Sequence, residues 1–204
     1  MTSQAVNHYA QGTVMIEDLI KSNRSCRRFL QTEAVPVDTL RWLVNLARLS
    51  ASAANLQPLK YILSNEPHKN EMIFSCLTWA AYLKDWPGPT EGERPSAYII
   101  IVGDWHIAKN FGTDMGIAAQ SILLGAREQG LAGCMIGSIN KELLQEMFHI
   151  PKRFEILLVI ALGKPKEIAV LEEVKPGEGI EYWRDEHGVH HVPKRPLDDI
   201  ILSQ

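Results

Sequence analysis

Hydrophobic side chains recur along this chain with two periods, and these periods predict alternating helices and strands. The clearest helix covers residues 37–50, where apolar side chains follow the i, i+3, i+4, i+7 rule. The residues on that face are Leu40, Leu43, Val44 and Ala47. The opposite face carries Trp42, Leu46 and Leu49. A helix that is apolar on both faces is expected to be buried on both.

Other segments continue the alternation. Helical signals occur at residues 13–22, 112–129 and 141–148, and strand signals at residues 60–64, 97–103, 133–139 and 154–163. Thr13 and Asn140 are candidate N-caps, and Gly130 is a candidate left-handed residue after a helix. The alternation alone favours a doubly wound parallel α/β protein.

Two segments interrupt this pattern. Residues 83–96 are rich in proline and glycine and form a candidate lid over a ligand. Residues 164–204 are charged, contain four prolines and include Tyr182 and Trp183. This tail is too polar to build its own core, so we expect it to pack on another surface.

Length and charge limit the possible functions. A chain of 204 residues is expected to form a single domain spanning residues 1–204, with 164–204 as an extended tail. The net charge of −3 provides no basic field for nucleic acid. The longest apolar run, Ile156 to Gly163, is far shorter than the roughly 20 residues of a membrane-spanning helix. With no signal-like start, we expect a cytoplasmic protein without nucleic-acid or membrane partners.

The cysteines and histidines do not suggest a metal site. Cys26, Cys76 and Cys134 are widely spaced, and we expect them to be reduced and mostly buried. Neighbouring arginines would lower the pKa of Cys26, although an unreactive core thiol is the favoured interpretation. His190 and His191 are adjacent in a predicted strand, so they would point to opposite faces and would not share a metal.

Three polar segments are candidate functional sites. "SNRSCRRF" (22–29) could present guanidinium and hydroxyl groups to an anion, although a solvated charge run is its commoner explanation. "SASAANLQPLKYIL" (50–63) combines small residues with two amides, and it could instead be an ordinary helix end and turn. "GLAGCMIGSIN" (130–140) is glycine-rich but lacks dinucleotide-binding spacing. None of the three is specific alone.

Their combination and order resemble the FMN-dependent nitroreductases. The segment "NRSCRRF" resembles the phosphate-binding opening of that family, and the segment "SAANLQPLKYIL" resembles its flavin loop. "DMGIAAQSILLGAREQGLAGCMIGSI" resembles the dimer helix and flavin-facing loop, and "MFHIPKRFEILLVIALGKPKE" and "PKRPLDDII" resemble the last strand and closing basic motif. Two departures are Asn23, where many relatives have arginine, and Leu59, where tryptophan is common.

The resemblance implies site residues by position. The FMN phosphate would be held by Arg24, Ser25, Arg27 and Arg195. The flavin ring and ribityl chain would be lined by Ser52, Ala53, Asn55 and Gln57, and the ring would be faced by Ile136, Gly137 and Ser138. No catalytic side chain and no metal ligand are assigned, because a flavin carries the redox chemistry itself.

The resemblance also implies fold, partners and activity. The expected fold is an α+β sandwich with a mixed central β-sheet flanked by helices, and a C-terminal extension that wraps the partner of a homodimer. The expected activity is transfer of hydride from NAD(P)H to nitroaromatic, quinone or similar acceptors by a ping-pong mechanism. The alternative is a flavin-binding sensor or carrier without broad reductase activity. Trp79, Tyr82 and Trp86 are either substrate-side or simple core residues.

Overall fold

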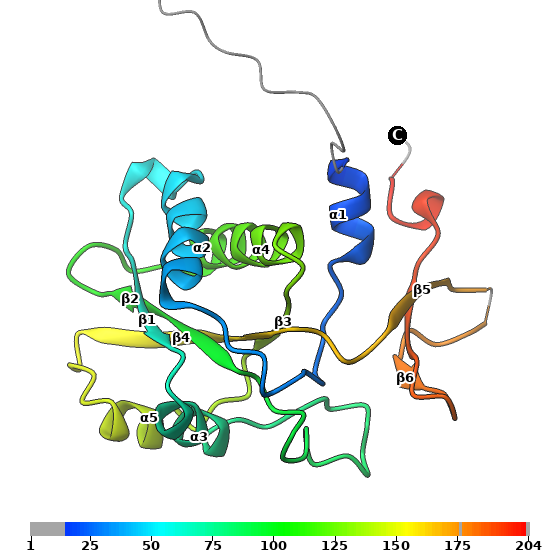
Figure 1. Cartoon of the computed structure of the whole chain (residues 1–204). Helices are drawn as coiled ribbons and strands as arrows, with labels where there is room; N and C mark the ends of the chain where they lie inside the picture. The colour runs from blue at the N-terminus through cyan, green and yellow to red at the C-terminus, as the bar shows by residue number, and fades with distance from the viewer. Residues whose placement is uncertain (1–14, 176, 203–204) are drawn as a thin grey trace, which may run out of the picture.

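A computed structural model describes residues 15–175 and 177–202 of the chain (Figure 1). In chain order its elements are α1 (Ile16–Ser22), α2 (Val37–Leu49), η1 (Ala53–Asn55), β1 (Leu59–Ser64), α3 (Pro67–Ser75), β2 (Ala97–Asp104), α4 (Gly112–Glu128), β3 (Ala132–Ile136), α5 (Lys141–Met147), β4 (Phe154–Gly163), β5 (Ala169–Glu173), β6 (Trp183–Arg184), β7 (His190–Lys194) and η2 (Leu197–Asp199). No helix among these residues has the length and apolar character to cross a membrane.

The central sheet has four strands in the order β1-β2-β4-β3, and every neighbouring pair is antiparallel. The two middle strands, β2 and β4, are apolar on both faces because helices cover both faces. Ile99 and Ile101 of β2 point toward α2 and α4, whereas Tyr98 and Ile100 point toward α3 and α5. The continuous apolar runs in the sequence therefore mark strands buried on both sides.

The helices form a layer on each face of the sheet. Figure 1 shows α2 and α4 above the sheet, and α3 and α5 below it. A side chain at Gly125 of α4 would collide with Leu46 and Leu43 of α2, so this glycine permits the two helices to pack closely. The close approach of α2 and α4 positions the loop after α2 against the start of α4.

Most predicted elements are present. The helices α2, α4 and α5 and the strands β1, β2 and β4 lie within one or two residues of their predicted bounds, whereas β3 ends three residues before the predicted position 139. Helix α3 was not predicted. The Asn140 side chain caps α5 by accepting a hydrogen bond from the Leu143 N–H at 3.1 Å, and Gly130 has a φ of +68°. The predicted cap Thr13 lies outside the described residues. Leu49 is 64% exposed, so the expectation that this helix is buried on both faces is wrong at its last turn.

The tail forms a second, three-stranded sheet, of which only the strand that contains His190 and His191 was predicted. Its order is β5-β7-β6, with β5 and β7 parallel and β6 and β7 antiparallel. The α+β fold class is confirmed, and mixed pairing occurs in this sheet rather than in the central sheet. The tail packs on residues 77–96 of its own chain, where Tyr182 contacts Tyr82 and Arg184 lies over the Trp86 ring. That the tail also wraps a partner stays a prediction.

Candidate functional site

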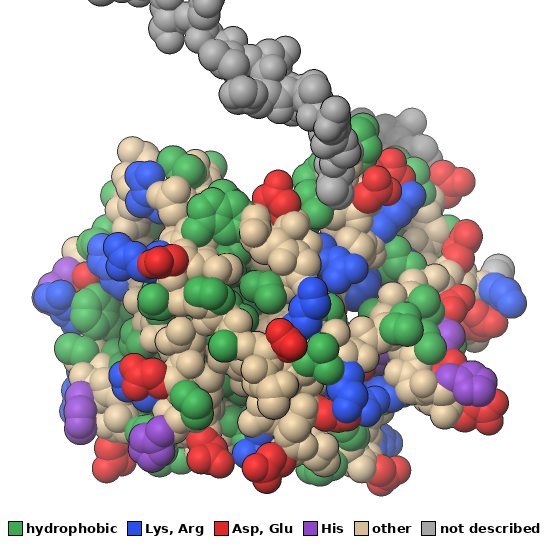
Figure 2. All heavy atoms as spheres, in the orientation of Figure 1, with side chains coloured by type: hydrophobic (Ala, Val, Ile, Leu, Met, Phe, Trp, Pro, Cys, Tyr) green, Lys and Arg blue, Asp and Glu red, His purple; other side chains and the backbone are tan. Residues whose placement is uncertain are grey.

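A hollow of about 230 Å³ lies where the segment after α1 meets α4, β3 and the tail. We call it the arginine pocket. Its lining residues are Asn23, Arg24, Ser25, Arg27, Gln120, Leu123, Gly133, Met135, Tyr182, His190, Val192 and Lys194. Figure 2 shows basic side chains gathered below α1, where the body of the molecule meets the tail.

The segment that opens this pocket is held in place by its backbone and its apolar residues. The Cys26 N–H donates to the Gly133 carbonyl of β3 at 3.0 Å. Cys26 and Phe29 are buried beside Ala132 in a small cluster of their own. Because the apolar residues of this segment face β3, Arg27 is directed to the other side, into the pocket.

Arg27 is a buried cation without a counter-charge. It is 8% exposed, and no carboxylate of the described residues lies within ion-pair distance of its guanidinium. The Glu167 carboxylate contacts the Arg27 backbone rather than its guanidinium: it accepts from the Arg27 backbone N–H at 2.7 Å and from Arg184 at 2.5 Å. A buried charge is costly unless it is paired, so this arrangement favours a bound anion.

His190 contacts Arg27 without adding charge. The Arg27 Nη1 lies 3.1 Å from the His190 Nε2, and because a guanidinium only donates, Nε2 accepts and the proton is on Nδ1. Burial and the neighbouring Arg27 outweigh Glu167 and lower the pKa of His190 to about 4. His190 is therefore neutral near pH 7, and the positive charge of the pocket comes from Arg24, Arg27 and Lys194.

The three arginines of the opening segment have different roles. Arg24 donates to the Ile20 carbonyl at 2.7 Å, its Nε has no partner among the described residues, and burial lowers its pKa. Arg28 points away from the pocket and forms a two-point ion pair with Glu93, at 2.6 and 2.7 Å. Arg28 is therefore structural, whereas Arg24 and Arg27 are available to a ligand.

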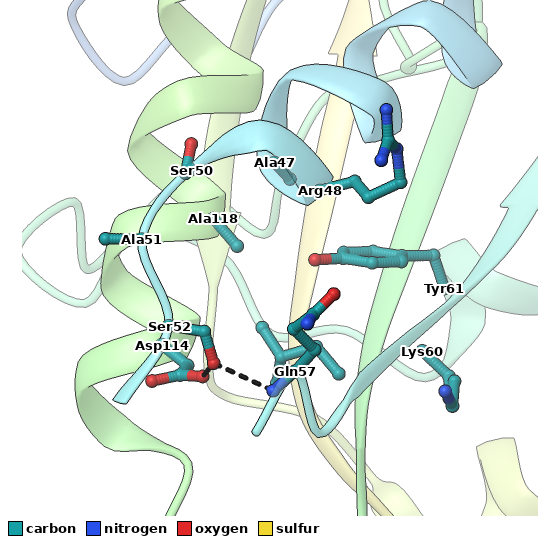
Figure 3. A pocket seen from close by; sticks show the side chains of 11 residues that line it. Ala47, Arg48, Ser50, Ala51, Ser52, Gln57, Lys60, Tyr61, Asp114 and Ala118 are labelled. Carbon is teal, nitrogen blue, oxygen red and sulfur yellow. Dashed lines mark hydrogen bonds between the residues drawn. The ribbon is translucent and has the colours of Figure 1, made fainter. Parts of the chain in front are cut away.

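A second hollow, of about 200 Å³, lies between the end of α2, the start of β1 and α4 (Figure 3). We call it the loop pocket. Its lining residues are Ala47, Arg48, Ser50, Ala51, Ser52, Gln57, Leu59, Lys60, Tyr61, Asp114 and Ala118. Figure 3 shows Ser52 and Asp114 side by side at one end and the Tyr61 ring at the other.

The loop of residues 52–57 is tied to α4 by Asp114. The buried Asp114 carboxylate accepts hydrogen bonds from the Ser52 hydroxyl and, at 2.9 Å, from the Ala53 N–H. The Ser52 Oγ in turn accepts from the Gln57 N–H at 2.9 Å. These bonds close the loop into a tight turn.

The same loop has a strained backbone. Three of its residues that are not glycine have left-handed φ angles: Ala54 at 49°, Asn55 at 54° and Gln57 at 53°. Such conformations cost free energy and cluster at ligand-binding sites. The bonds to Asp114 hold this costly conformation, so the loop is preorganised rather than adaptable.

The structure places the predicted residues in different surroundings. Arg24, Ser25 and Arg27 line the arginine pocket, and Ser52 and Gln57 line the loop pocket. Residues that line neither pocket are Ala53, Asn55, Ile136, Gly137, Ser138 and Arg195. Of these, Ile136 is buried at the end of β3, and the other five are exposed. Arg195 borders a hollow within the tail, and its neighbour Lys194 lines the arginine pocket instead.

The two pockets share no lining residue within one chain. The loop pocket contacts α4 at Asp114 and Ala118, whereas the arginine pocket contacts it at Gln120 and Leu123. Asp114 and Leu123 are about 13 Å apart along the helix axis at 1.5 Å per residue. The nearest members of the two linings on α4, Ala118 and Gln120, are only two residues apart.

Several residues of these pockets were missed by sequence reasoning. Asp114 has the usual appearance of an acidic residue in the first turn of a helix, and Glu167 lies in an ordinary charged stretch. Their importance comes from contacts across 61 and 140 positions of the chain, respectively. His190 was recognised only as a strand residue, and it faces Arg27 while His191 stacks on Trp183 on the other side.

The expectation of a lowered Cys26 pKa is wrong. Burial and the nearby Glu167 carboxylate raise the pKa of the Cys26 thiol to about 12. The adjacent arginines do not reverse this effect, because Arg27 and Arg28 point elsewhere. Cys26 is thus a core thiol, as the favoured interpretation held.

Comparison with known proteins shows to which family the chain belongs. The sequence model described as "Nitroreductase family" matches residues 20–88 and 96–164, which is well over half of the chain. The chain belongs to the nitroreductase family. The match includes the arginine segment, the strained loop and the end of β3. It does not include the tail after residue 164, which supplies Tyr182, His190 and Lys194 to the arginine pocket.

Individual members of the nitroreductase family are distant in sequence but similar in fold. YodC, a candidate NAD(P)H nitroreductase of Bacillus subtilis (strain 168), is 22% identical over 196 residues, covering 81% of this chain and 97% of its own. A candidate nitroreductase of Desulfovibrio desulfuricans, solved in complex with FMN, is 20% identical with a TM-score of 0.66, covering 95% of this chain and 98% of its own. An FMN-dependent nitroreductase of Clostridium difficile R20291 is 22% identical with a TM-score of 0.61, covering 72% and 86%.

Proposed function

We propose that this member of the nitroreductase family is an FMN-dependent oxidoreductase that takes hydride from NAD(P)H and reduces a nitroaromatic, a quinone or a similar acceptor. The observation that carries the proposal is Arg27, a buried guanidinium with no counter-charge among the described residues, in a pocket that also contains Arg24 and Lys194. FMN ends in a phosphate, which would neutralise this charge. The relatives named for FMN and NAD(P)H support the same cofactor and donor.

The pocket residues match the chemistry of a terminal phosphate. Arg24 and Arg27 provide guanidinium donors, Ser25 provides an exposed hydroxyl, and Lys194 provides an ammonium group. The hollow of about 230 Å³ has room for a phosphate, and its three cations suit a terminal phosphate better than the diester phosphates of FAD. This fit favours FMN over FAD.

The loop pocket would hold the rest of the flavin. Ser52, Asn55 and Gln57 provide hydroxyl and amide groups on a backbone fixed by Asp114, so they would orient polar groups of the ring and the ribityl chain. When bound, FMN accepts a hydride from the nicotinamide and passes reducing equivalents to the acceptor. The residues of the chain would bind and orient the cofactor, and none is required to form a covalent bond to substrate.

We also propose that the active unit is a two-fold homodimer in which each flavin contacts both chains. The two pockets are separate within one chain, which supports a shared site. Exposed apolar side chains gather at α1 and at the end of the tail: Ile16, Ile20, Leu197, Ile200, Ile201 and Leu202. A Cβ added at Gly116 would meet no atom within 4 Å, so this part of α4 is open to close approach.

The activity is tested with the purified protein. We expect it to release FMN on denaturation and to oxidise NAD(P)H steadily when a nitroaromatic or quinone is added. Release of FAD, or no flavin binding after reconstitution, would refute the cofactor assignment. FMN binding without acceptor-dependent oxidation would support the sensor or carrier alternative. Double-reciprocal plots at several acceptor concentrations should be parallel if one pocket serves donor and acceptor in turn, and intersecting lines would exclude a ping-pong mechanism.

The shared site is tested by complementation between inactive chains. Suppose that Arg27→Ala and Asn55→Ala each abolish activity in a homodimer. In a dimer of one variant chain with the other, both changes would fall in one site and the second site would be native. Co-expression should then restore up to about half of the wild-type activity per heterodimer. No recovery, or a fully active monomer, would show that each chain holds its own flavin.

A further inference from the structure

A third cavity, of about 460 Å³, lies between the start of α3, the segment before β2 and residues 31–34. It shares no lining residue with the arginine pocket or the loop pocket. We propose that this cavity binds a small molecule bearing a single carboxylate group. The site is separate from the proposed flavin site, and the proposal does not depend on it.

Three of the residues that line this cavity each carry a buried hydrogen-bonding group without a partner among the described residues. The Arg94 Nε, the Ser96 Oγ and the Tyr98 hydroxyl are buried, and none has a hydrogen-bond partner among the described residues. Tyr98 is 0% exposed and Ser96 is 8% exposed. Buried polar groups in folded proteins are nearly always satisfied, so three orphans in one place indicate a missing partner.

The strand geometry explains why these groups converge. Ser96 and Tyr98 flank Ala97, which is packed in the core on the side of α2 and α4, so both side chains point to the side of α3. The guanidinium of Arg94 stacks on the Phe74 ring of α3 at 4.4 Å. The buried Asn70 of α3 donates to the Ser96 carbonyl at 2.8 Å and so fixes the helix against this strand.

These groups without partners can donate hydrogen bonds to an anionic oxygen. The Arg94 Nε–H can only donate, and burial raises the pKa of Tyr98, so its hydroxyl keeps the proton and can donate. The helix α3 also begins at this cavity with Pro67 and His68 and has no side-chain cap; its N-cap residue is the acidic Glu66, whose carboxylate is paired with Lys69 at 2.7 Å. Its free N–H groups add positive potential at the same place.

Among the described residues, Arg94 is the one lysine or arginine that lines the cavity, so the ligand should carry no more than one negative charge. Glu71 lies 3.6 Å from the Arg94 Nη1 but is 70% exposed, so it neutralises the guanidinium only in part. Glu71 and Glu91, which also line the cavity, would repel a phosphate dianion more strongly than a carboxylate. The Phe74 ring and the neighbouring Pro67 and Pro95 provide an apolar wall for the body of the ligand.

The proposal is tested with benzoate as the probe. Calorimetric titration uses the FMN-saturated protein, so that flavin-site binding is seen independently as a change in the flavin spectrum. We expect one benzoate per chain without a spectral change. Tyr98→Phe and Arg94→Gln should each weaken binding at least about tenfold, since each removes one hydrogen bond to a charged group. The control is Arg153→Gln, because Arg153 stacks on Phe154 at 4.5 Å much as Arg94 stacks on Phe74, but at another place.

Several results would overturn the proposal. Equal benzoate binding by wild type, Tyr98→Phe and Arg94→Gln would place the probe elsewhere, and a flavin spectral change would place it at the flavin. Binding of inorganic phosphate but neither benzoate nor acetate would replace the carboxylate by a phosphate. If no anion binds, the cavity holds water only. The thermal midpoint of each variant is measured without probe, so that a folding defect is recognised separately from a loss of binding.

Discussion

Arg27 and Arg28 are adjacent in sequence, and the structure predicts opposite consequences for replacing them. Arg27→Ala removes a buried guanidinium that has no carboxylate partner and lies in the arginine pocket. Arg28→Ala removes a two-point ion pair with Glu93 and leaves the pocket intact. The two variants therefore separate a binding role from a structural one within a single turn of chain.

The expected magnitudes follow from the contacts. A hydrogen bond to a charged phosphate contributes about 1.5 to 3 kcal/mol, so Arg27→Ala should raise the Kd for FMN roughly ten- to 150-fold. Its effect on the stability of the flavin-free protein should be below about 1 kcal/mol. The reason is that the lost contacts with His190 and Tyr182 are offset by removal of an unpaired buried charge.

Arg28→Ala should show the reverse pattern. Its ion pair is partly buried, with side-chain exposures of 29% for Arg28 and 14% for Glu93, so its loss should cost about 1 kcal/mol of unfolding free energy. Lys166 remains 2.9 Å from Glu93 and limits this loss. The Kd for FMN should stay within about twofold of wild type, because Arg28 does not line the pocket.

The assay is a fluorescence titration of FMN into flavin-free protein, paired with urea unfolding of the same samples. Arg27→Lys serves as an intermediate, because it keeps the charge but not the two-point geometry of a guanidinium. An unchanged Kd in Arg27→Ala, or equal losses of affinity in the two alanine variants, would refute the assignment of Arg27 to the phosphate.

Three further predictions concern the loop of residues 52–57 and the arginine pocket. Asp114→Ala should release the strained loop and weaken FMN binding by about 1 to 3 kcal/mol in the same titration, whereas the exposed neighbour Thr113→Ala should not. Ala54→Gly should raise the urea midpoint, or at least not lower it, since its φ of 49° costs alanine about 1 kcal/mol or more. The pKa of His190 is about 4 in the folded chain, below its ordinary value of 6.5. Between pH 4 and pH 6.5, therefore, His190 binds a proton in the unfolded chain but not in the folded chain. Unfolding free energy should therefore fall as pH drops from 6.5 to 4, and His190→Gln should lack this component.

The sequence by itself determined the elements and the family. Apolar runs such as residues 154–163 have to be buried on both sides, and caps such as Asn140 and Gly130 act through neighbouring residues. Local signals of this kind can be read without knowing the fold. The order of the motifs also pointed to the nitroreductase family, whose sequence model matches the chain.

The hydrophobic pattern did not determine how the strands pair. Alternating helices and strands are compatible with a parallel sheet, yet all pairs in the central sheet are antiparallel. The pairing depends on which strands become neighbours, and β4 lies between β2 and β3 although it follows both in sequence. Within residues 164–202 only the strand that contains His190 and His191 was predicted, because the small sheet of the tail forms on surfaces contributed by other parts of the chain.

The tertiary structure alone decided the role of each charged residue. Arg24, Arg27 and Arg28 lie close together in the sequence, and only long-range contacts give them different roles. Glu93 pairs with Arg28, Glu167 pairs with Arg184, and Arg27 has no counter-charge among the described residues. The raised pKa of Cys26 has the same origin, because burial outweighs the charges next to it in sequence. Charge and burial act through space, and proximity along the chain does not specify either.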